Sequence, residues 1–590
     1  MANAPQAKMF VMRQMIETAP PRAPYTIGRY LGPTRIAYFS MEAALMPEMH
    51  TYSGGLGVLA GDTARSAADL ELPAVFVTLI SREGYLRQEI DAAGWQIEHA
   101  DPWTPEAFAT PLRAKVAVPI GDRDVWVRPW LYILGSPIGH SVPVLLLDTD
   151  LEENHREDRQ ITDRLYGGDE GYRLKQEIVL GIGGLRLLSA LGFAGIHRYH
   201  LNEGHAALLA LDLLRRYPKP ADQVAQDELM YDVRAVREKC IFTTHTPVEA
   251  GHDRFSYDLV EHLLPNYLPK DQMQLVAGQD AMNMTLLALN LSGFVNGVAE
   301  RHAETAQRMF PGYRIRAVTN GVHLPMWAHP AMAHVLTTYH PSWAHEPETL
   351  IQADQIPGAA IWEAHREAKR DLITYVSEQT GTKLDPDKPI IGYARRMTSY
   401  KRPDLLFSDI EALRRINSRY PFQVVLAGKA HPNDMPGKEL IRSLHGHIKD
   451  LKDEIPIAFL PNYDMAVAQV MVPGVDVWLN TPVPPMEASG TSGMKAALNG
   501  VLNLSVLDGW WLEACIEGVT GWSIGHDGET GPADATSEDL YAKLEVAVLP
   551  LYYNDRDAWT AMMKNTLSKI PPYFNTQRMM RRYAAEAYVR

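Results

Sequence analysis

The amino-acid sequence predicts an α/β fold of two Rossmann-like domains that face each other across a central cleft. Short apolar runs alternate with longer helical stretches from Ile36 almost to the end of the chain, which is typical of buried parallel strands joined by helices. The chain has 590 residues, more than one hydrophobic core usually supports. A proline-rich segment separates two series of apolar runs. We therefore expect an N-terminal domain over residues 1–320 and a C-terminal domain over residues 321–590.

The first series of apolar runs predicts the strands of the N-terminal domain. These runs are residues 36–41, 74–80, 144–147, 241–244 and 314–318. The second series predicts the strands of the C-terminal domain, at residues 390–394, 423–427, 457–460, 475–479 and 502–507. Between the two series, residues 320–360 contain five prolines, which argue against one continuous element there.

The tail of the chain predicts a closing helix that packs on a domain. Asn575 and Thr576 follow two prolines and offer a helix cap. Apolar side chains then recur on one helical stripe. They are Met579, Met580, Tyr583, Ala587 and Tyr588.

The charge balance excludes several classes of partner. Lys plus Arg total 57 against 71 Asp plus Glu, a formal net charge of −14, which argues against non-specific binding to nucleic acid or to an anionic membrane. An anionic ligand must therefore meet a local basic cluster. No apolar run approaches membrane-spanning length, and the N-terminus lacks a basic region followed by an apolar core. We expect a soluble, cytoplasmic protein.

Neither the cysteines nor the histidines predict a metal site. The two cysteines, Cys240 and Cys515, are too few for a disulfide framework or a cysteine metal site and fit a reducing compartment. The histidines between residues 329 and 345 are spaced too irregularly for a zinc helix. No metal is expected.

Residues 487–500, Glu-Ala-Ser-Gly-Thr-Ser-Gly-Met-Lys-Ala-Ala-Leu-Asn-Gly, give the strongest indication of function. Gly490 and Gly493 let the backbone approach a bound group, and Lys495 should project from the first turn of a helix. Asn499 and Gly500 then end that helix. A lysine amine among small, apolar neighbours is partly desolvated, which favours the neutral form that condenses with a carbonyl as a Schiff base.

Two other interpretations of this segment compete with this one. A surface helix with a solvated lysine is the common meaning of such a pattern. A Walker-type phosphate loop does not fit, because alanine rather than Ser or Thr follows Lys495 and the glycine spacing is wrong.

Two further segments predict anion contacts. Residues 51–62, which include Gly54 and Gly55, indicate either a glycine loop that opens a helix toward an anion or a simple tight turn. Residues 393–402 follow a predicted strand and concentrate Arg395, Arg396, Lys401 and Arg402. A solvated basic edge is the alternative, but the carboxyl end of a strand faces the cleft of an α/β domain, where paired Arg donors and a mobile Lys suit a dianion.

Together, these segments resemble those of the α-glucan phosphorylases, the family of glycogen, starch and maltodextrin phosphorylases, in a short prokaryotic form. Residues 487–509 resemble the segment with the pyridoxal-phosphate lysine, residues 36–42 and 51–62 the glycine loop near the substrate phosphate, and residues 393–402 the segment that holds the phosphates. The resemblance implies a glycosyltransferase architecture of the GT-B type, pyridoxal 5′-phosphate bound to Lys495, and a homodimer. With no room for a regulatory region before Ile36, allosteric control of the long enzymes is not expected.

The resemblance also assigns residues to roles. It implies catalytic roles for Lys495, Arg396, Lys401, Gly55 and His245. The cofactor contacts implied are Lys495, Arg395, Arg396, Lys401, Tyr463, Thr491, Ser492 and Gly493. The substrate contacts implied are Gly54, Gly55, His245, Asn320, Glu487, Ala488, Ser489 and Gly490.

The activity implied is reversible phosphorolysis. An α-1,4-glucan such as glycogen or maltodextrin loses its non-reducing-end glucose to inorganic phosphate, giving α-glucose 1-phosphate with retention, while the 5′-phosphate of the cofactor donates and accepts a proton. A nucleotide-sugar-dependent glucan synthase and a glucan-binding protein with a decayed site are the alternatives. A chromophore fixed to Lys495 by borohydride would exclude the first, and release of glucose 1-phosphate would exclude the second.

Overall fold

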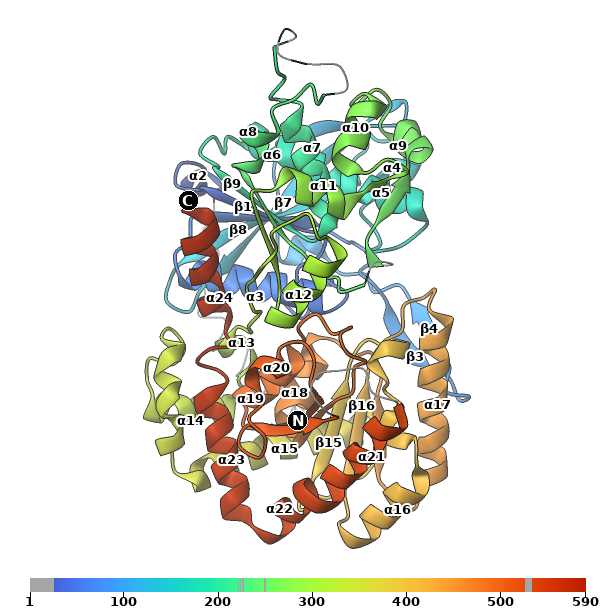
Figure 1. Cartoon of the computed structure of the whole chain (residues 1–590), viewed down its shortest axis with the longest axis vertical. Helices are drawn as coiled ribbons and strands as arrows, with labels where there is room; N and C mark the ends of the chain where they lie inside the picture. The colour runs from blue at the N-terminus through green and yellow to red at the C-terminus, as the bar shows by residue number, and fades with distance from the viewer. Residues whose placement is uncertain are drawn as a thin grey trace.

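Two large β-sheets organise the chain, one in its N-terminal part and one in its C-terminal part (Figure 1). The structure is a computed structural model that describes residues 26–220, 222, 224, 228–248, 251–525 and 533–589. The N-terminal residues, whose sequence lacks the pattern of a targeting leader, lie outside the described residues. Every strand predicted from the sequence belongs to one of the two large sheets.

The sheet of the C-terminal part has six parallel strands. In spatial order they are β17 (Ile457–Leu460), β16 (Gln423–Ala427), β15 (Ile390–Ala394), β18 (Val477–Asn480), β19 (Leu502–Val506) and β20 (Gly521–Ile524). The chain builds outward from β15 to one edge and then from β18 to the other, which is the order of doubly wound nucleotide-binding folds. The loops that leave β15 and β18 therefore diverge at the carboxyl edge of the sheet, where such folds bind ligands.

The sheet of the N-terminal part has ten strands. In spatial order they are β14 (Arg316–Ala317), β13 (Phe294–Gly297), β10 (Cys240–Thr243), β9 (Arg198–Asn202), β1 (Ile36–Ser40), β2 (Ala74–Leu79), β8 (Ser141–Asp148), β7 (Arg123–Gly135) and β5 (Thr110–Pro111), with β6 (Val116–Ile120) paired to β7. The pairs from β14 to β8 are parallel, whereas β7 runs antiparallel to its neighbours. Because β2 and β9 flank β1 on opposite sides, the winding reverses between β1 and β9.

Helices pack on both sheets and connect their strands. In the N-terminal part they are α2 (Gly28–Leu31), α3 (Gly55–Asp69), α4 (Arg156–Arg159), α5 (Glu170–Ile178), α6 (Gly184–Leu191), α7 (Leu208–Leu214), α8 (Val233–Arg237), α9 (Tyr257–Leu263), α10 (Lys270–Ala277), α11 (Met284–Leu291) and α12 (Glu300–Met309). Those that follow are α13 (Leu324–Trp327), α14 (Pro330–Tyr339), α15 (Gly358–Thr380), α16 (Ile410–Arg419), α17 (Met435–Leu451), α18 (Met465–Gly474), α19 (Ser492–Leu498), α20 (Trp511–Ala514), α21 (Ala533–Lys543), α22 (Leu549–Asn554), α23 (Arg556–Lys569) and α24 (Thr576–Tyr583).

The chain crosses between the two parts twice, and the crossings touch. The first crossing lies near residue 322, where prolines in the first turns of α13 and α14 break the segment into short helices, as predicted. At the second crossing, the Val322 amide donates to Phe574 O at 3.2 Å and the Thr576 amide donates to Val322 O at 3.0 Å. The closing helix α24 then packs Met579, Met580 and Tyr583 into the N-terminal core beside α3, so its predicted apolar stripe is confirmed.

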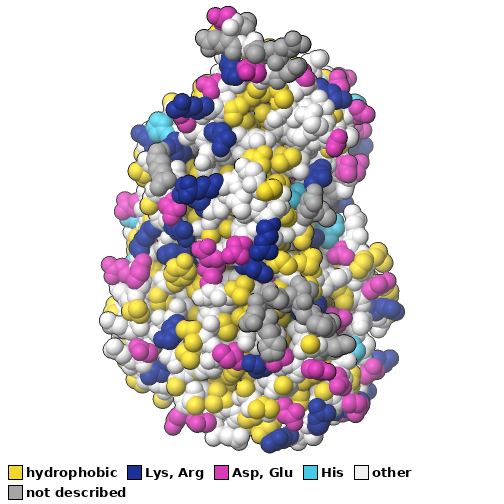
Figure 2. Space-filling model, in the orientation of Figure 1, with side chains coloured by type: hydrophobic (Ala, Val, Ile, Leu, Met, Phe, Trp, Pro, Cys, Tyr) yellow, Lys and Arg dark blue, Asp and Glu magenta, His cyan; other side chains and the backbone are white. Residues whose placement is uncertain are grey.

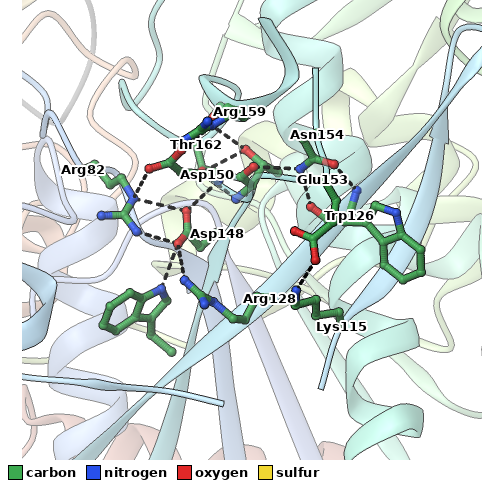
Figure 3. A network of polar contacts seen from close by, with 12 residues as sticks. Arg82, Lys115, Trp126, Arg128, Asp148, Asp150, Glu153, Asn154, Arg159 and Thr162 are labelled. Carbon is green, nitrogen blue, oxygen red and sulfur yellow. Dashed lines mark hydrogen bonds and ion pairs between the residues drawn. The ribbon is translucent and has the colours of Figure 1, made fainter. Parts of the chain in front are cut away.

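A two-stranded hairpin, β3 (Arg87–Ile90) with β4 (Gln96–His99), extends from the N-terminal part to the side of α17 (Figure 1). Gln88 Nε2 donates to Gly428 O at 2.8 Å, and Gln96 Nε2 donates to Ala430 O at 2.9 Å. The segment that leads into the hairpin is anchored by Arg82, which bonds to the buried Asp148 at the end of β8 (Figure 3). A second small hairpin pairs β11 (Arg254–Ser256) with β12 (Ala281–Asn283).

The surface carries both signs of charge, which are interspersed over the face in Figure 2. Within the described ranges, none of the helices combines the length and the apolar character needed to cross a membrane. The same residues contain no group of three His, Cys, Asp or Glu side chains arranged to hold a metal ion.

Candidate active site

Lys495 lies on α19, directly after the loop that leaves β18. Gly490 has φ +79°, and the helix ends at Asn499 and Gly500 (φ +73°), as the sequence predicted. The Lys495 side chain is buried, and its Nζ lies 3.5 Å from the centroid of the Trp327 ring. Burial lowers the pKa of Lys495 to about 8. The predicted helix and the predicted desolvation of the amine are both confirmed.

A glycine is required at position 493 for a different reason from the approach of a bound group that the sequence predicted. A β-carbon at Gly493 would lie 2.4 Å from Asn503 Oδ1 and 2.6 Å from Trp510 Cζ2. The close approach that the structure shows there is to the chain itself. Trp510 and Trp511 are both buried and pack against each other.

Arg395 and Lys401 converge on one carboxylate. They follow β15, while Glu487 follows β18, the neighbouring strand where the winding of the sheet reverses. Arg395 Nη1 lies 3.1 Å from Glu487 Oε2, and Lys401 Nζ binds the same oxygen. Burial alone would raise the pKa of Glu487, but the two cations outweigh it and hold this pKa below its usual value. A basic cluster at the carboxyl edge of the sheet was predicted, but its pairing with Glu487 was not.

A pocket beside this cluster is lined by residues of the same loops. Ser489 and Gly490 line it, as do Asn480, Asp508 and Trp510. Asp508 Oδ2 accepts a hydrogen bond from the Glu487 amide at 2.8 Å, and burial raises the pKa of Asp508 to about 6. Ala488 lies between Glu487 and Ser489 and is half-buried.

Arg396 and Tyr463 flank Arg395 without binding Glu487. Arg396 is exposed and lies within electrostatic range of Tyr85 in the N-terminal part. Burial raises the pKa of Tyr85 to about 12, and the charge of Arg396 partly opposes this shift. Tyr463 lies within electrostatic range of Arg395, and burial raises its pKa. Thr491 and Ser492 precede Lys495 in the chain, and Ser492 Oγ accepts a hydrogen bond from Trp478 Nε1 at 3.1 Å.

The glycine loop opens α3 and leaves room beside both of its paired glycines. Gly54 is the N-cap of α3 and has φ −167°, so neither Gly54 nor Gly55 adopts the positive φ that a tight turn would require. A β-carbon built at either glycine meets nothing within 4 Å. Glu42 Oε2 accepts from the Ser53 amide at 2.6 Å and from the Gly54 amide at 3.2 Å. The loop therefore opens a helix, but its Ser53 and Gly54 amides bind the Glu42 carboxylate and are not free for a bound anion.

His245 and Asn320 lie on the N-terminal part, near the carboxyl ends of its strands. His245 Nε2 donates to Asn202 Oδ1 at 2.7 Å, and burial lowers the pKa of His245 to about 3, so the ring is neutral. The side-chain oxygen of Asn320 is buried and has no hydrogen-bond partner among the described residues. In the part of the chain that the structure describes, no hydrogen bond or ion pair joins either residue to Glu487.

The N-terminal part contacts the lysine segment through α3. Asp62 on α3 accepts a hydrogen bond from Trp327 Nε1 at 2.7 Å, and the Trp327 ring lies under the Lys495 amine. Tyr52 in the glycine loop accepts from the Met465 amide at 2.9 Å, next to Tyr463 in the chain. Sequence reasoning missed Asp62, Glu42 and Trp327 because no local pattern marks a partner that is distant in the chain.

The switch point of a doubly wound sheet, with cations in its loops, is the place where α/β enzymes commonly hold phosphorylated ligands. Comparison with known proteins assigns the family. Residues 269–519 match the model of the Phosphorylase family, described as carbohydrate phosphorylase. The chain belongs to this family, as its relatives also show.

Its relatives include several that align with 94% of this chain. The maltodextrin phosphorylase of Thermococcus litoralis is 38% identical over 70% of its own length. The glycogen phosphorylase of Mycobacterium tuberculosis is 36% identical over 71% of its length. The glycogen phosphorylase of Aquifex aeolicus is 35% identical over 86% of its length.

Proposed function

We propose that the protein is an α-glucan phosphorylase. It transfers the non-reducing-end glucose of an α-1,4-glucan, glycogen or maltodextrin, reversibly to inorganic phosphate and yields α-glucose 1-phosphate with retention. Family membership and the names of the relatives support the reaction. The observation in this chain that carries the proposal is Lys495, a buried lysine of lowered pKa on the helix that follows β18, the strand after which Glu487 binds Arg395 and Lys401.

The proposal includes the whole architecture. The two parts of the chain, divided near residue 320 and with α24 packed back on the first part, act as GT-B domains that close on a shared cleft. This proposal is supported by the strand orders, which put ligand-binding edges in both sheets. We expect a cytoplasmic enzyme and a homodimer.

The residues around Lys495 fit pyridoxal 5′-phosphate. A buried amine with a pKa of about 8 has a far larger neutral fraction at pH 7 than a solvated lysine. Lys495 would hold the cofactor covalently, with Tyr463, Thr491, Ser492 and Gly493 beside it. When bound, the cofactor supplies a phosphate group that can donate and accept a proton.

Arg395, Arg396 and Lys401 would hold phosphate groups. Two phosphates cannot approach each other while fully charged, so cations and a shared proton must compensate them. Arg donors pair with phosphate oxygens, and the Lys401 amine adds a point charge. Gly54 and Gly55 would let substrate phosphate reach the first turn of α3, since no side chain intervenes.

The sugar would be held by residues from both parts. Neutral His245 and the unpartnered oxygen of Asn320 can each exchange a hydrogen bond with a hydroxyl group. Both ion pairs of Glu487 use Oε2, so Oε1 can accept from a sugar hydroxyl, with Ala488, Ser489 and Gly490 alongside. Substrate phosphate protonates the glycosidic oxygen, and no protein carboxylate needs to act as the nucleophile.

Replacement of Lys495 tests the proposal. Lys495→Ala should abolish both cofactor retention and the release of glucose 1-phosphate from maltoheptaose and phosphate, because no other group would bind the aldehyde. The measurements are a near-ultraviolet absorbance scan, peptide mass after borohydride fixation, and the phosphorolysis rate. Lys449→Ala, at an exposed position of α17, is the control. An unchanged rate in Lys495→Ala would refute the assignment.

Arg396→Ala separates phosphate binding from glucan binding. Loss of an exposed cation that serves phosphate should raise the KM for phosphate by about tenfold or more, equivalent to about 1.4 kcal/mol. The KM for maltoheptaose should stay within about twofold of wild type. A defect confined to the glucan would contradict the placement of Arg396.

A further inference from the structure

Three elements meet at the Lys495 amine. The lysine comes from α19, the aromatic face beneath it is Trp327 from α13, and the carboxylate that holds the Trp327 ring is Asp62 from α3. All three side chains are buried. The N-terminal part therefore contacts the lysine through a single intervening ring.

Asp62 is fixed from both sides of its carboxylate. Oδ2 accepts from Trp327 Nε1 at 2.7 Å and from the His323 amide at 3.1 Å, while Oδ1 faces Arg65 Nη1 at 3.3 Å. Arg65 is itself held by the carbonyl groups of Ala44 and Leu45. The ring of Trp327 therefore has one orientation, and the lysine amine rests on its face.

Two charged side chains act on the amine, and they act in opposite directions. Burial has the largest effect and lowers the pKa of Lys495. Of the two charged side chains, Asp62 raises this pKa and Arg65 lowers it. The other elements around α19 add no charge: α13, α18, β18 and β19 carry no charged side chain, and none of the charged side chains of α23 acts on the amine. The nearby His323 ring pairs with Asp69 at 2.9 Å.

We propose that Asp62 and Trp327 are positioning residues that orient Lys495 and set the pH at which its amine becomes available to the cofactor. The ring face holds the protonated amine by a cation–π contact, and Asp62 stabilises the same protonated form across the ring. Asp62 lies on α3, seven residues after the helix begins at Gly55, which is about 10 Å along the helix axis. The helix that begins at the glycine loop thus also influences the lysine. This inference rests on the proposed function only in taking Lys495 as the cofactor lysine.

The test measures the pH midpoint of Lys495 reactivity in the full-length protein purified without cofactor. The neutral amine attacks a trace of acetic anhydride and releases acetate, and the mass of the Lys495 peptide reports the rate between pH 6 and pH 10. Asp62→Asn keeps an oxygen for Trp327 and His323 but removes the charge. Its midpoint should fall by about half a pH unit or more. Arg65→Gln should move the midpoint in the opposite direction.

Asp69→Asn is the matched control. Asp69 is a buried carboxylate on the same helix that binds His323 and does not act on Lys495, so its loss should leave the midpoint unchanged. A midpoint that is the same in Asp62→Asn, Arg65→Gln and wild type, in proteins with native thermal unfolding, would overturn the inference. Equal shifts in Asp69→Asn and Asp62→Asn would also overturn it, because they would indicate a general structural effect.

A second measurement separates the inference from the proposed function. Uptake of pyridoxal phosphate, trapped with borohydride and located by peptide mass, should follow the same shifted pH dependence in Asp62→Asn. If Lys495 shows the expected midpoints but no variant takes up the cofactor, the proposed function fails and the inference on the amine stands. If the cofactor is bound and the midpoints do not move, the inference fails alone.

Discussion

Two adjacent carboxylates at the candidate active site have opposite electrostatic environments. Glu487 binds Arg395 and Lys401, which hold its pKa low despite burial. Asp508 forms no ion pair among the described residues. It accepts hydrogen bonds from the Glu487 and Gly509 amides, and burial raises its pKa to about 6. Environments that separate the pKa values of neighbouring acids are typical of functional sites.

Asp508 should make stability depend on pH. Because the folded state raises its pKa to about 6, its contribution to stability is complete below the unfolded pKa of about 4 and is lost as pH rises through 6. Asp508→Asn removes this loss. Relative to wild type, the thermal midpoint of Asp508→Asn should therefore rise between pH 4 and pH 7. Asp453→Asn, at an exposed position, should show no such trend, and a flat difference for Asp508→Asn would contradict the pKa shift.

At the scale of elements, α24 stabilises a part of the molecule that is distant in the sequence. Met579 and Met580 lie in one core cluster with β1 and α3. Tyr583 OH contacts Thr243 Oγ1 at 3.1 Å and accepts from Asn296 Nδ2 at 2.9 Å. The helix therefore contributes both apolar packing and polar pairing to the N-terminal sheet.

Met579→Ala should destabilise the N-terminal part. Truncation of this buried side chain leaves a cavity, with an expected loss of about 2–5 kcal/mol in the free energy of unfolding. Amide exchange in β1 and β9 should rise, while exchange in β15 and β16 should stay as in wild type. Val589→Ala, at a position 82% exposed, is the control; equal exchange in both variants would show that the helix is not required.

The sequence predicted the elements whose environment is uniform. The runs that became β1, β2, β15 and β16 are buried along their whole length and mostly apolar, because both faces of a buried parallel strand are covered. β7 was not predicted: charged residues and a proline interrupt its apolar positions, and its first half alternates between buried and more exposed residues. The site was predicted where a local motif carries it, as at Lys495, and missed at Trp327 and Asp62, whose roles come from tertiary contacts.

At the scale of the whole molecule, the β3–β4 hairpin carries polar contacts between the two parts. Gln88 alone donates to Gly428 O at 2.8 Å and accepts from the Asn462 amide at 2.8 Å. Lys438 on α17 pairs with Glu98 at 2.8 Å. These contacts hold the loops after β16 and β17, close to Tyr463, against the N-terminal part.

Gln88→Ala should loosen this contact. Two hydrogen bonds between the parts are lost, and the buried groups they served are left unpaired, a cost of about 1–3 kcal/mol each. Hydrogen–deuterium exchange should increase at residues 428–430 and 462 together with the hairpin. Glu89→Ala changes the exposed neighbour on the opposite face of the strand and should leave exchange unchanged. An increase confined to the hairpin would show that the contact does not couple the parts.

The paired crossings at Val322 and Thr576 have a consequence for any domain movement. Two peptide chains that run side by side and are hydrogen-bonded to each other behave as one narrow hinge, so they favour rotation about a single axis and resist sliding. The second crossing also means that a cut at residue 320 would not give two independently folding halves. The upstream fragment would lack α24, and the downstream fragment would end in a helix whose apolar face has lost its packing partner.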